Sequence, residues 1–166
     1  TIAKGHTLVF GGYSSETAPV GTGKVKFDFG TWSATGFSTN TTRLGGEIDV
    51  DQSNNTLSGL RAAINAQDLQ VTASFLKTGD NSYSLMLKSK EGAANALRLS
   101  VTEAPDASGL SNINYTSVNN SIETVTASDA AFKIDGTTIT RTRATATTPT
   151  PETAATNNNG NNKNEN

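Results

Sequence analysis

His6 is the single histidine of this chain, and it is the first residue to consider for acid–base chemistry near neutral pH. A histidine can activate a serine or bind a metal when other groups stand beside it. Its neighbours in the run KGHTL include no acid, and one histidine cannot build a multi-histidine metal site. We therefore expect a surface position for His6 and no catalytic role.

Oxygen-bearing side chains alternate from Asp49 to Asn55 in the run DVDQSNN, as they do in a calcium-binding loop. An EF-hand loop starting at Asp49 would need glycine at its sixth position and glutamate at its twelfth, where this chain has Asn54 and Leu60. No apolar pocket that would tune Asp49 and Asp51 for acid–base work is evident. The pattern favours the end of a strand that leads into a helix cap.

The remaining chemical signals are weaker. The lone G-x-G of GTGKVKF precedes a strand, whereas a dinucleotide-binding loop follows a strand and precedes a helix. The absence of cysteine excludes disulfides, iron–sulfur clusters and thiolate zinc sites. We predict no catalytic, cofactor-binding or metal-binding residues, no cofactor and no enzymatic activity; an enzyme of unknown type is the weakest alternative.

Composition points to a thin core. Of the 166 residues, 34% are hydrophobic and 6% aromatic, which is enough for one domain or two small ones built as layered β-structure. With 13 basic and 15 acidic residues, the net charge of −2 offers no basic surface for nucleic acid. No apolar run approaches the roughly 18 residues that would span a bilayer, and the N-terminus carries no Sec-type signal. Neither nucleic acid nor membrane is an expected partner.

The stretch 54–75, NNTLSGLRAAINAQDLQVTASF, changes its period in the middle. Its first half has helical spacing, with Thr56 placed to cap the first turn. Its second half alternates as a half-buried strand does. The apolar positions of the helical half are Leu57, Leu60, Ala63 and Ile64, and those of the strand are Leu69, Val71, Ala73 and Phe75. We expect the helix to lie across one side of a small antiparallel sheet and to close its core.

Several other segments have strand patterns. They are 24–29, 47–51, a hairpin around 79–81, a strand through 97–101, and a hairpin over 129–143 that turns at Asp135-Gly136. The segment 31–46 is expected to be a long connection held by Trp32 and Phe37. With about seven strands and one helix, the predicted fold is mainly β (α+β): a small antiparallel sheet or sandwich with one short packed helix. Residues 146–166, rich in Asn, Thr and Pro, are expected to be a disordered tail.

The stretch 54–75 and the following YSLMLKSKEGAANALRLSVTEA resemble the flagellin hook IN motif. The matching positions are Thr56, Leu57, Leu60, Ala63, Ile64, Asn65, Val71, Ala73, Leu85, Leu87, Ser89, Gly92, Asn95 and Leu97. The flanking runs AKGHTLVFGGYSSETAPVGTGKVKFDFG and ASDAAFKIDGTTITRTR are similar to the head region of flagellar filament cap proteins, the FliD family (flagellar hook-associated protein 2). The resemblance covers roughly residues 3–143.

The resemblance implies a structural component of the bacterial flagellum. On this interpretation residues 1–20 lead into the head, residues 21–145 form a β-rich head that contains the motif at about 46–102, and 146–166 is the tail. Cap proteins are exported through the flagellar secretion system, form a ring-like homo-oligomer at the extracellular tip and promote flagellin assembly there. Flagellin subunits, further copies of the chain, an export chaperone and host surface ligands are the partners so implied. The helical leg segments of the family have no counterpart in this sequence.

The alternative is an adhesive or host-binding outer domain of a flagellar surface protein, which would recognise a glycan or a protein. Trp32 and Tyr115 are the candidate recognition residues, because an exposed aromatic ring can stack on a sugar face. They fall in the segments 31–46 and 105–128, where surface contacts are expected on either hypothesis. Packing of Trp32 within its own segment is the competing interpretation.

Overall fold

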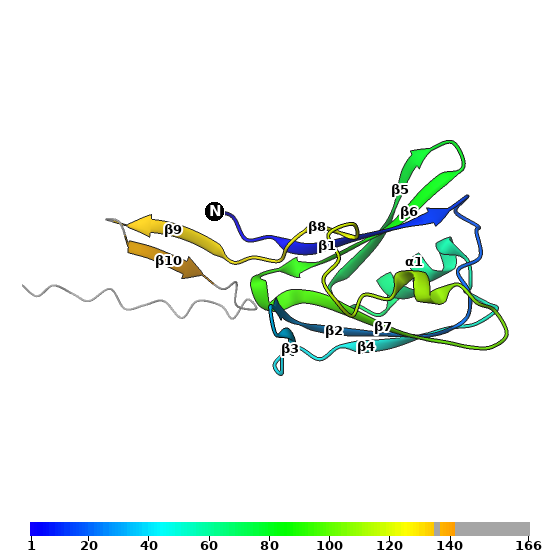
Figure 1. Cartoon of the computed structure of the whole chain (residues 1–166), viewed down its shortest axis with the longest axis horizontal. Coiled ribbons are helices and arrows are strands. Elements are labelled where there is room, and N and C mark those ends of the chain that lie inside the picture. The colour runs from blue at the N-terminus through cyan, green and yellow to red at the C-terminus, as the bar shows by residue number, and fades with distance from the viewer. Residues whose placement is uncertain (135–136, 142–166) are drawn as a thin grey trace, which may run out of the picture.

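The computed structural model describes residues 1–134 and 137–141, which contain ten strands, one α-helix and two short 3₁₀ helices (Figure 1). The strands are β1 (Gly5–Tyr13), β2 (Gly23–Ser33), β3 (Gly36–Thr39), β4 (Gly46–Val50), β5 (Val71–Gly79), β6 (Ser82–Glu91), β7 (Ala96–Glu103), β8 (Glu123–Val125), β9 (Ala130–Ile134) and β10 (Thr137–Arg141). The helices are α1 (Leu57–Ala66), η1 (Ala93–Asn95) and η2 (Leu110–Ile113). The predicted mainly-β fold with one α-helix is confirmed. The expected turn at Asp135-Gly136 and the tail 146–166 lie outside the described residues.

Two antiparallel sheets form the body of the molecule. One has the strand order β5-β6-β1-β8, and the other is centred on β2. Along one edge of β2 lie β4, beside its first half, and β3, beside its second half, while β7 pairs along the opposite edge. β9 and β10 form a separate two-stranded hairpin. None of the helices in the described part is long and apolar enough to cross a membrane.

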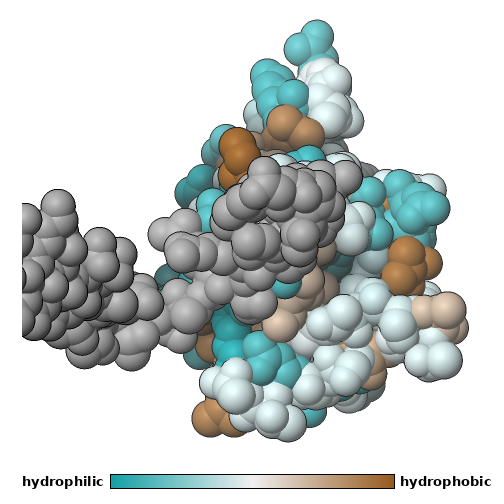
Figure 2. All heavy atoms as spheres, turned by 90° about the vertical axis from the view of Figure 1, so that its left-hand side faces the viewer, coloured by the Kyte–Doolittle hydropathy of each residue, from teal (hydrophilic) through white to brown (hydrophobic). Residues whose placement is uncertain are grey.

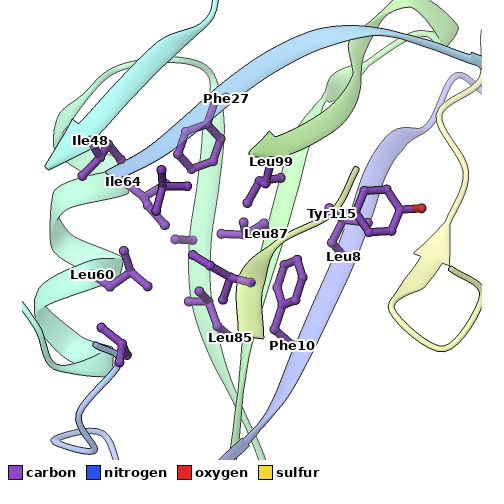
Figure 3. Packing of buried hydrophobic residues seen from close by; sticks show 14 of the residues in the cluster. Leu8, Phe10, Phe27, Ile48, Leu60, Ile64, Leu85, Leu87, Leu99 and Tyr115 are labelled. Carbon is purple, nitrogen blue, oxygen red and sulfur yellow. The ribbon is translucent and has the colours of Figure 1, made fainter. Parts of the chain in front are cut away.

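The core lies between the two sheets, as Figure 3 shows. In β2 the alternation seen in the sequence puts Val25, Phe27 and Phe29 inside, each without solvent exposure. The opposite sheet contributes the inward residues of β1 and β6, and β7 adds its own. These inward residues are Leu8, Phe10, Leu85, Leu87, Leu97 and Leu99.

The helix α1 joins the edges of the two sheets, since it contacts β5 of one and β4 of the other (Figure 1). Thr56 caps it as predicted: its hydroxyl oxygen accepts a hydrogen bond from the Gly59 N–H at 3.0 Å. Leu57, Leu60 and Ile64 are fully buried, and Figure 3 shows Leu60 and Ile64 pointing from the helix into the core. The helix therefore closes the open side between two layers, whereas we expected it on one side of a single sheet.

The side chain of Asn65 attaches the end of α1 to the edge strand β5. Its Nδ2 donates to the Ala73 carbonyl at 3.0 Å, and its Oδ1 accepts from the Ala73 N–H at 2.8 Å. β5 pairs with β6 along its other edge, so the Asn65 amide completes backbone bonding where no further strand is present. The connection from α1 to β5 is short, because the chain turns through left-handed conformations at Asp68 and Gln70, with φ of 52° and 57°.

The expectation of a long connection over 31–46 is wrong. β2 continues to Ser33 and forms a hairpin with β3, in which Trp32 lies opposite Phe37. Gly30 interrupts the alternation of β2, and a Cβ at that position would lie 2.0 Å from the Ser38 carbonyl oxygen. Glycine at this position permits the close approach of β3. In the sequence Gly30 looks like the end of a strand, but in the structure it allows the β2–β3 hairpin to form.

Replacing Leu60 or Ile64 by aspartate is expected to unfold the domain, because it would bury a carboxylate in the hydrophobic core. Truncation to alanine already removes about 2–5 kcal/mol at such sites, out of a typical total of about 5–15 kcal/mol. Circular dichroism and thermal melting measure the effect, with Ala62→Asp, on the exposed side of α1, as the control. A Leu60→Asp chain that keeps the wild-type spectrum and melting temperature would contradict the placement of the helix.

Asn65→Asp is expected to lower the free energy of unfolding by about 1–3 kcal/mol, because a carboxylate cannot donate to the Ala73 carbonyl and instead repels it. Urea denaturation measures this loss. Gln67→Glu is the matched control, since it adds the same charge at the same helix end on an exposed side chain. Equal losses in the two variants would show that the paired hydrogen bonds of Asn65 contribute nothing.

Candidate functional site

The structure places the predicted motif residues in the core and at its turns. Leu57, Leu60, Ile64, Val71, Ala73, Leu85, Leu87 and Leu97 are all buried. Asn65 makes the paired bonds to Ala73 described above. These side chains are occupied by packing and backbone hydrogen bonds, so they are not available to bind a partner.

A second asparagine of the motif, Asn95, holds the turn before β7. Its Nδ2 donates to the Glu91 carbonyl at 2.7 Å, and its Oδ1 accepts from Nη1 of Arg43 at 2.6 Å. The Arg43 guanidinium also donates to the Leu69 carbonyl at 2.6 Å and lies 3.6 Å from the centroid of the Phe29 ring. Burial lowers the pKa of Arg43 from its ordinary value. Arg43 thereby joins the β3–β4 loop, the turn after α1 and η1.

His6 is fully buried, so the expectation of a surface position is wrong. Its Nδ1 accepts a hydrogen bond from the Leu97 N–H at 2.9 Å. Because a backbone N–H can only donate, the ring proton is on Nε2, which donates to Oε1 of Glu123 at 3.0 Å. β1 and β7 belong to different sheets, so this imidazole links the sheets by a hydrogen bond. The acid that the local sequence lacks comes from a residue 117 positions away.

Burial lowers the pKa of His6 from its ordinary value of 6.5, and the nearby Glu123 carboxylate opposes that shift. The neutral form also suits the geometry, since a proton on Nδ1 would face the Leu97 N–H. His6 therefore links the sheets as a neutral imidazole at pH 7.

Tyr115 is buried, with 1% of its surface exposed, so its assignment as a surface recognition residue is wrong. Its backbone exchanges two hydrogen bonds with Leu99, of 2.8 and 3.0 Å, which place it against the edge of β7. The ring centroid lies 5.7 Å from those of His6 and Trp32. Burial raises the pKa of the Tyr115 hydroxyl. In the sequence Tyr115 is an aromatic residue in a polar segment. Nothing in that segment indicates the backbone hydrogen bonds to Leu99 that place it in the core.

Trp32 is half-buried. Its Nε1 donates to the Leu97 carbonyl at 3.0 Å, and its ring packs against Phe37 at 4.8 Å between centroids. The ring therefore packs within its hairpin, as one interpretation predicts, and it also lines a surface pocket of about 300 Å³ together with Glu123. Recognition of a ligand by Trp32 stays a prediction.

The acidic run at 49–55 contains the end of β4 and the turn before α1, as its pattern predicts. Asp51 accepts hydrogen bonds from the backbone N–H and hydroxyl of Ser53, and these lower the pKa of its carboxyl group. Asp49 pairs with Lys24 at 3.1 Å. Within residues 1–134 and 137–141, no group of three or more acidic or histidine side chains is arranged to hold a metal ion.

Acidification from pH 8 to 5.5 is expected to destabilise the fold. The pKa of His6 is lowered in the folded chain, so the unfolded chain binds the proton more readily once the pH falls below about 6.5. The stability that depends on neutral His6 is complete above that pH and declines as the pH falls through the folded pKa.

Melting temperatures of the wild type and His6→Gln over this range measure the contribution. The variant should be less stable at pH 8 by about 1–3 kcal/mol, and its melting temperature should depend less on pH. Parallel pH profiles for the two chains would contradict the role of His6.

No protein-family model matches the sequence, and no curated protein matches it either. Solved structures do match. One is the structure of the D1-D2-D3 domains of the flagellar cap protein FliD from Escherichia coli, with 25% sequence identity and a TM-score of 0.66. This match covers 86% of this chain and 40% of that chain. The D2-D3 domains of the Serratia marcescens cap protein match at 26% identity and TM-score 0.68, with 86% and 73% covered.

FliD from Pseudomonas aeruginosa PAO1 shares the fold at 19% identity and TM-score 0.62, with 84% and 62% covered. This chain thus spans less than half of the Escherichia coli three-domain structure. Matches in several species cover most of the chain. The chain resembles the flagellar cap protein FliD, and its fold is that of the FliD head domains.

Proposed function

We propose that this chain is the head region of a flagellar filament cap protein, which promotes flagellin assembly at the filament tip through protein–protein contacts. The observation that carries the proposal is the match to FliD domains over 86% of the chain. The hook IN motif supports it, since its asparagines hold the turns of this fold. On this proposal the chain acts as a structural protein and not as an enzyme.

The finer parts of the proposal come from the resemblance. Residues 1–20 lead into the head, 21–145 form it, and 146–166 are a tail. The partners are further copies of the chain in a ring-like homo-oligomer, flagellin subunits and an export chaperone. The site of action is the extracellular tip of the flagellum, reached through the flagellar secretion system.

Exposed apolar side chains on the loops and the hairpin supply contact points for such partners. Leu44 is 85% exposed in the β3–β4 loop, directly after Arg43, whose three contacts hold that loop in place. Leu76 in β5 and Val118 before β8 are also exposed, and the β5–β6 hairpin projects from the body (Figure 1). Figure 2 shows hydrophobic residues separated by hydrophilic ones over the face it presents. Separate anchors of this kind suit contacts with several subunits better than one continuous interface.

The adhesive alternative loses one of its two aromatic residues, because Tyr115 is buried. Trp32 keeps a partly exposed ring, and host surface ligands therefore stay among the outcomes to be tested.

Deleting the gene in its source bacterium distinguishes the two functions. A filament cap is required for assembly, so the mutant should carry hooks without filaments and should release flagellin into the medium. Electron microscopy and immunoblots of the medium measure both, and the wild-type gene supplied on a plasmid is the control. A mutant that keeps normal filaments but binds host surfaces less well would support the adhesive function and contradict the cap.

A further inference from the structure

The pocket beside Trp32 lies where β2 extends beyond its partner β7. The pairing of these strands ends at Gly30 and Ala96, so the last residues of β2 border open space of about 300 Å³ on that side. The segment before and after β8 forms the opposite wall, which includes Val118 and Ala127. With Ala93 and Ala96, which precede and begin β7, the pocket is built from three segments that are far apart in sequence.

A single carboxylate determines the charge of this pocket. Among the described residues that line it, Glu123 alone carries a charge, and its side chain is 11% exposed. The hydrogen-bond partner of Glu123 is His6, and the Leu97 N–H requires an unprotonated Nδ1 on that ring. His6 therefore donates a hydrogen bond to the carboxylate without neutralising it. A shielded carboxylate with a neutral donor favours an incoming cation.

The other walls specify which cation. Trp32 is held by its bond to the Leu97 carbonyl and by Phe37, so a partly exposed aromatic ring is fixed beside the carboxylate. An aromatic face together with a carboxylate is a typical arrangement for binding ammonium groups. The rest of the lining combines the hydroxyl side chains of Thr31, Ser33 and Thr126 with apolar ones, and its alanines, Ala93, Ala96 and Ala127, suit an aliphatic stem.

We propose that this pocket receives a lysine side chain of a partner protein, with the ammonium group at Glu123 and the methylene stem along the alanines. One carboxylate oxygen is already bonded to His6, so the two-oxygen arrangement that arginine prefers is not free. Val118, which is 50% exposed, offers an apolar contact to the residues that flank such a lysine. The proposal goes beyond the cap assignment and does not depend on it, because the argument uses the pocket alone.

Trp32 is the only tryptophan of the chain, so its fluorescence reports directly on the pocket. The purified chain would be titrated with a blocked pentapeptide that carries one lysine between alanines, and with the same peptide carrying Nε-acetyl-lysine. We expect a saturable change in emission with the lysine peptide and binding weaker by about tenfold or more with the acetylated one. Equal binding of both peptides, or no saturable change with either, would overturn the proposal.

Two further probes test the identity of the ligand. An arginine peptide should bind more weakly than the lysine peptide, and equal affinity would contradict selection of lysine. Butylammonium chloride has the same head and stem without flanking residues, and it should also bind more weakly. If it binds as tightly as the peptide, the site serves free amines and the proposed protein partner is wrong.

Glu123→Gln removes the charge and keeps an oxygen that accepts from His6. We expect it to weaken binding of the lysine peptide by about tenfold, while the melting temperature and the emission of the free chain stay close to wild type. Glu47→Gln, at an exposed carboxylate on β4, is the matched control and should bind as the wild type does. Undiminished binding by Glu123→Gln would overturn the proposal, and the two wild-type peptide titrations decide the matter if that variant does not fold.

Discussion

The thin apolar layer between the two sheets is the constraint on which the rest of the structure depends. Only 34% of the residues are hydrophobic, so little apolar burial is available to offset the cost of an unpaired polar group. Each polar side chain that is buried in the layer therefore needs a hydrogen-bond partner. His6 uses both ring nitrogens, one toward the Leu97 N–H of one sheet and the other toward Glu123. Among the described residues no buried side-chain nitrogen or oxygen lacks a hydrogen bond. Such fully matched polar links specify how one sheet lies on the other, which apolar packing alone does weakly.

The stretch that resembles the hook IN motif has a structural role in this setting. Its apolar positions fill the layer, while Asn65 and Asn95 bond to backbone groups at the two turns that bring α1 and β7 into place. Asparagine suits both positions because its amide carries a donor and an acceptor on one short side chain. The motif residues therefore direct the assembly of a helix–strand unit.

The parts of the fold that depend on neighbouring residues were predictable from the sequence. The helix over 57–66, its cap at Thr56 and the hairpin around 79–81 follow from local periodicity and turn residues. The burial of His6 and Tyr115 was not predictable, because it depends on Glu123 and Leu99, which no local pattern connects to them. The β2–β3 hairpin was not predictable for another reason. Gly30 interrupts the alternation of the strand in the sequence, and the same glycine makes the hairpin sterically possible.

One consequence concerns mechanical force. The first residues run antiparallel to the segment around Ser128–Ala131: Lys4 pairs with Ser128, and Thr1 pairs with Ala131. Tension that pulls these two segments apart loads their hydrogen bonds one after another, as in opening a zipper, and not all at once as in shear. The body of the domain would thus resist pulling less than its number of backbone bonds suggests. A chain drawn from either side into a narrow channel would begin to separate at this pair of segments, on the side of the body that faces away from α1 and from which β9 and β10 extend (Figure 1).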